Sequence, residues 1–183
     1  LGSSARAQNI EAIGIGVSSN AYGSDSISLG PNSKSTNNNS IAIGSSAFSL
    51  DQEAIAIGHL SNAYSLYSIA MGTGSISSNT HSIAIGRNSS GHDQSTIAIG
   101  LDSNAYSTSS IAIGTSSISS NINSIAIGPS SISSDQSAIA IGTSANSYSQ
   151  DSIAMGTNSI SSNTNSISIG TNPISSGTNS IAT

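Results

Sequence analysis

A glycine recurs every fourteenth residue along most of the chain, and this period limits the possible folds more than any other feature. Repetition at a short, fixed spacing is the signature of a solenoid, in which each repeat packs on its neighbours. Ile stands three positions before each of these glycines, and Ile, Leu or Met stands one position before it. The glycines are Gly16, Gly30, Gly44, Gly58, Gly72, Gly86, Gly100, Gly114, Gly128, Gly142, Gly156 and Gly170.

Each repeat predicts two short strands and two turns. The unit Ser-Ile-Ala-Ile-Gly alternates β-branched and small residues and then ends in Gly, which is typical of a strand followed by a turn. In a second alternation, the third and fifth residues after Gly are small, which indicates an enclosed face, while the fourth and sixth vary, which indicates solvent. We therefore expect an all-β solenoid without any helix longer than a turn: a lead-in segment at 1–11, then thirteen 14-residue coils at 12–183, the last incomplete.

The side-chain directions of the first strand follow from hydrophobicity. We expect the two Ile residues of a coil, for example Ile111 and Ile113, to point into the coil and Ala112 between them to point out. The resulting column of outward Ala residues would let several chains pack closely about a common axis. The Gly column is expected to mark a positive φ or a corner too tight for a Cβ atom.

A longer period overlies the first. Asn-Ala-Tyr at 20–22, 62–64 and 104–106 recurs every 42 residues, and Asn-Ser-Tyr at 146–148 continues the series. Duplication of a three-coil segment explains this spacing, and so does a match to a ligand that repeats every ~14 Å. The variable outward positions form a candidate contact surface, unless a neighbouring subunit covers them. It comprises Tyr22, Tyr64, Tyr106, Tyr148, Phe48, Ile76, Ile118, Ile132, Ile160 and Ile174.

The composition argues against several classes of function. Charged residues make up 6% of the chain and the net charge is −5, so Arg6, Lys34 and Arg87 are too few to form a nucleic-acid-binding patch. No apolar run approaches the ~20 residues of a membrane-spanning helix, so direct membrane insertion of this segment is not expected. The chain begins and ends within the repeat pattern, which suggests a segment of a longer protein.

Titratable residues do not form a recognisable active site. His59, His81 and His92 occupy three different coil positions. Asp51, Asp93 and Asp135 share one coil position but are three coils apart, whereas a Ca²⁺ site needs several clustered oxygen ligands. We expect all six to be surface or turn residues. The sequence therefore predicts no catalytic, cofactor-binding or metal-binding residues, and a protein that is not an enzyme.

The Ser-Ile-Ala-Ile-Gly unit, with small residues three and five places after Gly and a 14-residue period, resembles the head repeats of the YadA-like trimeric autotransporter adhesins. The resemblance covers about residues 12–183. It implies a left-handed parallel β-roll, a homotrimer, and display outside a Gram-negative cell with adhesion to an extracellular matrix protein or a cell-surface receptor. Ser prevails here in the second strand, where the family more often has Ala.

Two alternatives use the same fold. A phage or large-virus fibre could employ the coils as a spacer or receptor binder on the virion surface. An ice-binding solenoid would need an unbroken Thr column, but the column just after Gly is interrupted by Val17, Pro31 and Arg87, among others. Its threonines are Thr73, Thr115, Thr143, Thr157 and Thr171.

Overall fold

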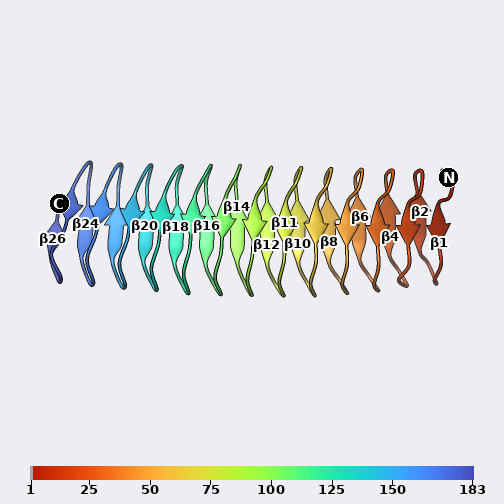
Figure 1. The fold of residues 1–183 in the computed structure, drawn as a ribbon, viewed down its shortest axis with the longest axis horizontal. Coiled ribbons are helices and arrows are strands. Elements are labelled where there is room, and N and C mark those ends of the chain that lie inside the picture. The colour runs from red at the N-terminus through yellow and green to blue at the C-terminus, as the bar shows by residue number, and fades with distance from the viewer. Residues whose placement is uncertain (1) are drawn as a thin grey trace. The chain divides into compact units, whose positions relative to one another are not determined.

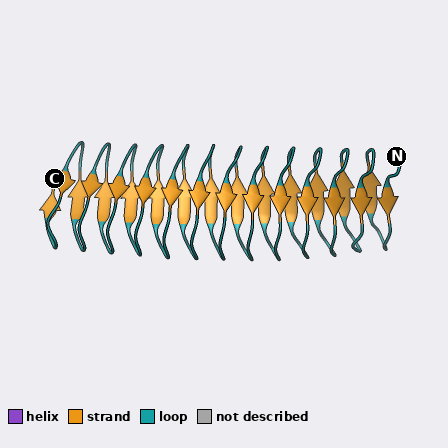
Figure 2. Ribbon diagram, in the orientation of Figure 1, coloured by secondary structure: helices purple, strands orange, loops and turns teal. Residues whose placement is uncertain are grey.

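The computed structural model describes residues 2–183 as strands joined by turns, and no helix occurs among them (Figure 2). The chain divides into two compact units, which meet in the sequence between His92 and Asp93. In Figure 1 the first unit runs from red to yellow-green and the second from green to blue. Since the described residues form no helix, none of them supplies a helix long and apolar enough to cross a membrane.

In the first unit, each coil contributes a three-residue strand to one sheet and a two-residue strand to the other. The three-residue strands are β2 (Ile13–Ile15), β4 (Ile27–Leu29), β6 (Ile41–Ile43), β8 (Ile55–Ile57), β10 (Ile69–Met71) and β12 (Ile83–Ile85). The two-residue strands are β1 (Arg6–Ala7), β3 (Asn20–Ala21), β5 (Lys34–Ser35), β7 (Phe48–Ser49), β9 (Asn62–Ala63), β11 (Ile76–Ser77) and β13 (Ser90–Gly91).

The second unit repeats this arrangement. Its even-numbered strands are β14 (Ile97–Ile99), β16 (Ile111–Ile113), β18 (Ile125–Ile127), β20 (Ile139–Ile141), β22 (Ile153–Met155), β24 (Ile167–Ile169) and the shorter β26 (Ile181–Ala182). Its two-residue odd-numbered strands are β15 (Asn104–Ala105), β17 (Ile118–Ser119), β19 (Ile132–Ser133), β21 (Asn146–Ser147), β23 (Ile160–Ser161) and β25 (Ile174–Ser175). All even-numbered strands belong to one sheet and all odd-numbered strands to the other.

Neighbouring strands are parallel and pair with a shift of one repeat, so identical coil positions stack. Ile41 pairs with Ile55 and Ala42 with Ala56, as do Ile111 and Ile125 in the second unit. This confirms the predicted all-β solenoid of parallel strands. The expected lead-in segment at 1–11, of which Leu1 lies outside the described residues, already contains β1, and Arg6 pairs with Asn20.

The interior of the coils is lined mostly by Ala and Ser. The expected direction of the first strand is therefore wrong. Ala112 is completely buried, whereas Ile111 and Ile113 on either side of it are only half-buried. The Ala column is thus the core, and the Ile residues form an outer surface. Ala56 in one sheet and Ala63 in the other belong to the same buried cluster, so the two sheets approach closely enough for methyl groups to meet.

Local hydrogen bonds explain how so many serines are buried. In most coils the serine five places after Gly donates its hydroxyl across the coil to a backbone carbonyl, as Ser133 does to Ala138 (2.7 Å) and Ser119 to Ser124 (2.8 Å). The serine three places after Gly donates back to that Gly, as Ser33 does to Gly30 (2.8 Å). Burying a hydroxyl is costly unless it is bonded. A narrow interior with carbonyls at its edges therefore suits Ser and Ala but has no room for Ile.

The Gly column has both properties expected of it. Gly58 has a φ of +135°, and a Cβ atom added there would lie 2.6 Å from the carbonyl oxygen of Gly72 in the next coil. The turns also contain left-handed residues two places after Gly and five places before the next one, such as Ser116 (φ 55°) and Ser109 (φ 57°). Asn, Asp and Ser, which tolerate this conformation, are common at both positions.

Candidate functional site: two outer faces of the coils

The coils expose two faces of different character. The isoleucine face consists of the side chains three positions and one position before each column glycine, which project outward from the three-residue strands. Parallel pairing in register stacks them into two apolar ladders, as for Ile97 with Ile111 and Ile99 with Ile113. Most are half-buried, and Met71 and Met155 are exposed. A continuous apolar ladder of this kind is typical of a surface that contacts protein.

The second face carries the candidate contact surface. Its residues lie on or next to the two-residue strands, on the side opposite the buried Ala and Ser residues. Three of its tyrosines are exposed by 37 to 45% and Ile174 by 62%, while Tyr22, Phe48, Ile76, Ile118, Ile132 and Ile160 are half-buried. The structure brings these residues onto one face within each unit.

The asparagines of the 42-residue pattern brace the turns. Asn62 Nδ2 donates to the carbonyl of Leu60 (2.9 Å), and Asn104 Nδ2 donates to that of Asp102 (2.9 Å). Because each accepting residue has a positive φ, the amide stabilises the same turn in each of these coils. Sequence reasoning missed this contribution, although an Asn two residues after a turn position is a usable signal. The tyrosine of the pattern remains exposed in three of its four copies.

Basic and aromatic side chains interact on the second face of the first unit. Lys34 Nζ lies 5.6 Å from the ring centre of Tyr22 and 5.3 Å from that of Phe48. Phe48 in turn meets Tyr64 edge to face, with ring centres 6.1 Å apart. Sequence reasoning listed the three aromatic residues but not Lys34. The sequence signal for Lys34 was its position in the coil, which is the position that Phe48 occupies in the next coil.

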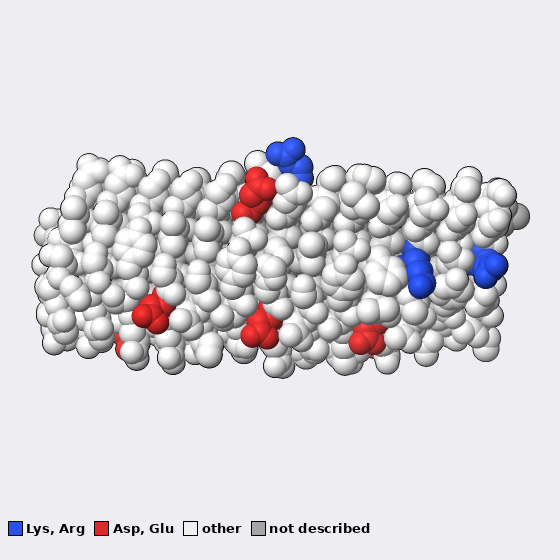
Figure 3. Space-filling view, viewed as in Figure 1, with Lys and Arg blue, Asp and Glu red and all other residues white. Residues whose placement is uncertain are grey.

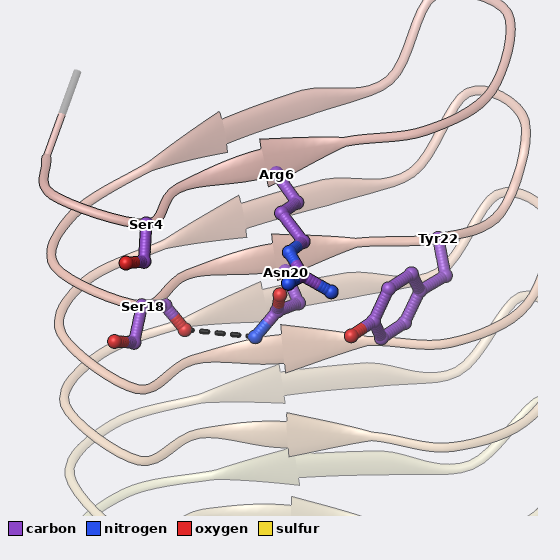
Figure 4. Close-up of a pocket in the computed structure, with 5 residues that line it drawn as sticks. All are labelled: Ser4, Arg6, Ser18, Asn20 and Tyr22. Carbon is purple, nitrogen blue, oxygen red and sulfur yellow. Dashed lines mark hydrogen bonds between the residues drawn. The ribbon is translucent and has the colours of Figure 1, made fainter.

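A shallow depression of about 260 Å³ adjoins this group of side chains. Its lining consists of Ser4, Arg6, Ser18, Asn20 and Tyr22 (Figure 4). Arg6 extends over Asn20 toward the Tyr22 ring, and Asn20 Nδ2 donates to the carbonyl of Ser18 (2.8 Å). In Figure 3 two basic side chains lie close together near the N-terminal end of the first unit, and no acidic side chain separates them in that view.

The titratable turn residues behave as local structural groups. Asp51, Asp93 and Asp135 each accept the backbone N–H of the following glutamine at 2.7 Å. The Gln94 N–H, and then the Thr108 hydroxyl, lower the pKa of Asp93 below its ordinary value.

The three histidines are exposed at their separate positions. Partial burial of its ring lowers the pKa of His92 even though the residue as a whole is exposed, and its Nε2 lies 3.0 Å from Ser90 Oγ. Across residues 2–183, no group of three or more His, Cys, Asp or Glu side chains is placed to hold a metal ion.

Comparison with known proteins identifies the repeat. The YadA head domain repeat matches residues 7–33, 21–47, 52–75, 63–89, 94–117, 119–145 and 148–172, which together exceed half of the chain. The crystal structure of the collagen-binding domain of the Yersinia adhesin YadA is similar, with a TM-score of 0.64 and 25% sequence identity over 72% of this chain and 80% of that one. No curated protein sequence matches. By its repeats and its fold, the chain belongs to the YadA-like head repeats of the trimeric autotransporter adhesins.

Proposed function

We propose that this chain is a non-enzymatic adhesive module of a bacterial surface protein that attaches the cell to an extracellular matrix protein or a receptor on another cell. The observation that carries this proposal is the contrast between the two outer faces. One is a uniform apolar ladder suited to assembly, and the other varies in sequence and exposes tyrosines. The similar Yersinia domain is described as collagen-binding, which supports a matrix protein as the partner.

The isoleucine face would hold three copies of the chain together. Two half-buried apolar side chains per coil remain accessible along each unit, and covering such surface contributes about 25 cal/mol per Å². Cyclic symmetry lets the same face of every copy turn toward one axis. The isoleucine face takes the assembly role expected of the Ala column, because the Ala side chains are buried inside the coil and cannot contact another chain. Three is the number of subunits that family membership supports.

A trimer built in this way leaves the candidate contact surface outward. Tyrosine offers a large apolar area with a polar tip at little cost in side-chain entropy, and it is common in binding surfaces. Exposed tyrosines that recur every three coils suit an extended or multivalent partner, for which several weak contacts add up. The alternative of a virus fibre gains no support from the family model or from the Yersinia structure, since each of these describes a YadA-type protein.

The test is a variant in which Tyr64, Tyr106 and Tyr148 are all changed to Ser, compared with the single variant Tyr67→Ser. Tyr67 is equally exposed (43%) but lies in a turn, outside the contact surface. Binding to immobilised collagen, fibronectin and laminin is measured after light scattering has established that both variants keep the parent's assembly state. We expect the triple variant to lose about tenfold or more in binding, as when interface anchors are truncated, and Tyr67→Ser to bind like the parent. Unchanged binding by the triple variant would place the adhesive surface elsewhere.

A further inference from the structure

Two of the chain's three strong bases lie on the outer face of β1, β3, β5 and β7, although the chain carries a net charge of −5. Lys34 lies between the rings of Tyr22 and Phe48, and Arg6 lines a depression together with Tyr22. We propose that this basic-aromatic patch, made of Arg6, Asn20, Tyr22, Lys34 and Phe48, binds an acidic saccharide, a sugar chain that bears carboxylate or sulfate groups. The proposal rests on the proposed function in one respect, namely that this face points outward in the assembled protein.

The patch holds positive charge that the described chain does not neutralise. Neither Arg6 nor Lys34 forms an ion pair with a carboxylate of residues 2–183. Arg6 is exposed and lines the depression with two serine hydroxyls. A guanidinium group presents a planar set of donors that matches carboxylate and sulfate oxygens, and such charge-assisted bonds are the strong ones at a surface. The anionic group of the ligand would lie against Arg6.

The aromatic rings hold the second cation in place and supply flat apolar surfaces. Lys34 Nζ is within 6 Å of two ring centres, which restrains a side chain that is otherwise flexible. Asn20 is also fixed by its bond to Ser18. A ligand therefore meets side chains that are already ordered, which reduces the entropy lost on binding. Apolar ring faces next to hydroxyl and amide groups are complementary to a sugar, which has C–H faces and hydroxyl edges.

Backbone pairing favours a saccharide over an acidic peptide. The N–H groups of Asn20, Tyr22 and Lys34 each donate to the next coil at 2.9 Å, so an extended peptide could not add main-chain hydrogen bonds to this face. Recognition must use side chains alone. Arg6 and Phe48 are three coils apart in the same column, about 14 Å at the usual strand spacing. That length corresponds to an oligosaccharide and exceeds a single sugar.

The experiment measures fluorescence anisotropy of labelled probes with the full chain: a heparin-derived octasaccharide as the sulfated probe, sialyllactose as the carboxylated probe and lactose as the neutral one. At least one acidic probe should bind, lactose should not, and binding should weaken as salt is raised because exposed charges are screened. The double variant Arg6→Gln, Lys34→Gln should lose about tenfold or more in affinity. Tyr22→Ser should also weaken binding by severalfold.

Two variants outside the patch serve as controls for the loss of a charge and of a tyrosine. Arg87→Gln removes a positive charge outside the patch, and Tyr148→Ser removes the tyrosine at the same coil position in another coil. Both should bind the acidic probe within about twofold of the parent. Poly-glutamate serves as an acidic peptide probe. The proposal would be overturned by equal losses for Arg87→Gln and each of the patch variants, by equal binding of lactose, or by binding of poly-glutamate alone.

Matrix adhesion measured on the same samples separates the two proposals. If the Arg6, Lys34 variant loses saccharide binding but still adheres to matrix protein, the saccharide site is supported and the adhesive function stands on its own. If the variant with Tyr64, Tyr106 and Tyr148 changed to Ser loses neither activity, the adhesive proposal fails while the saccharide site stands. Absence of binding to both acidic probes by the parent chain refutes the saccharide site alone.

Discussion

At the scale of single residues, the space inside the coil and the backbone conformation decide which side chain is possible. Gly58 combines a φ of +135° with a neighbouring carbonyl where a Cβ atom would lie, so any side chain there is strained in two ways. Gly74 is different. It occupies the turn position two residues after Gly72, with a φ of +67°, and Ser46 adopts nearly the same conformation in another coil (φ 55°). Only the first kind of glycine is required by the fold.

This difference predicts unequal effects of the same substitution. Gly58→Ser should lower the free energy of unfolding by about 3 kcal/mol or more, because strain at a special φ and a backbone clash add. Gly74→Ser should change it by less than about 1 kcal/mol, since the clash there is with the side chain of Asn88 and Ser is native to this position elsewhere. Urea unfolding followed by circular dichroism compares them. Similar midpoints for the two variants would contradict the account of the Gly column.

At the scale of strands and turns, the sequence predicted the period, both strands of each coil, the turns and the enclosed face of the second strand. It failed on the direction of the first strand. The alternation shows that Ile111 and Ala112 face opposite sides of the strand. Hydrophobicity alone predicts that the Ile side faces the interior, whereas the structure buries the Ala side. The criterion that worked for the second strand, uniformly small residues on the enclosed face, holds here too: the position of Ala112 is occupied by Gly, Ala or Ser in every coil.

The candidate contact surface was predictable as a set of outward positions because those positions vary. The contacts between the side chains of this surface were not predictable from the sequence. The contacts of Lys34 with Tyr22 and Phe48 depend on how long side chains bend across neighbouring coils, which a one-dimensional pattern does not contain. The same holds for the depression beside Arg6. The hydrogen bond from Asn62 to the carbonyl of Leu60 could have been predicted, since short polar side chains often bond to nearby turn carbonyls.

The corrected orientation of the strand predicts the outcome of a pair of substitutions in β16. Ala112→Val should destabilise by about 1–3 kcal/mol, because the buried methyl group has Ala98 and Ala105 in its cluster and no space for two more carbons. Ala112→Ser should be nearly neutral, as Ser28 and Ser168 already occupy equivalent buried positions. Thermal unfolding of the two variants against the parent measures both. A larger loss for Ser than for Val would mean that the interior is apolar and roomy, contrary to the structure.

At the scale of the whole molecule, we propose that the isoleucine face serves assembly and that the second face serves recognition. Each unit carries the same isoleucine ladder, whereas the second face changes from coil to coil between Arg, Asn, Ile, Lys, Phe and Ser at a single column. Changing one inner residue disturbs both neighbouring coils, because each coil packs only on the adjacent ones. Outward residues are free of that constraint. Under this proposal, binding specificity can diverge on the second face while the isoleucine face keeps a constant geometry.

The last prediction tests this division with two sets of matched substitutions in the second unit. Changing Ile97, Ile111 and Ile125 to Thr removes apolar groups from the isoleucine face, and changing Ile118, Ile132 and Ile160 to Thr removes the same groups from the candidate contact surface. All six side chains are half-buried in the single chain, so their intrinsic effects on coil stability should be similar.

Light scattering at micromolar concentration should find a trimer for the parent and for the contact-surface set, and dissociation for the isoleucine-face set. Fully burying an exposed isoleucine is worth about 1.5–3 kcal/mol, so covering the exposed part of each half-buried side chain contributes roughly half of that. Three substitutions in each of three subunits remove several such contributions from one interface. Circular dichroism controls for loss of the fold in both sets. Dissociation caused only by the contact-surface set would show that the subunits meet through the tyrosine-bearing face, in which case the isoleucine ladders would be the surface left for a partner.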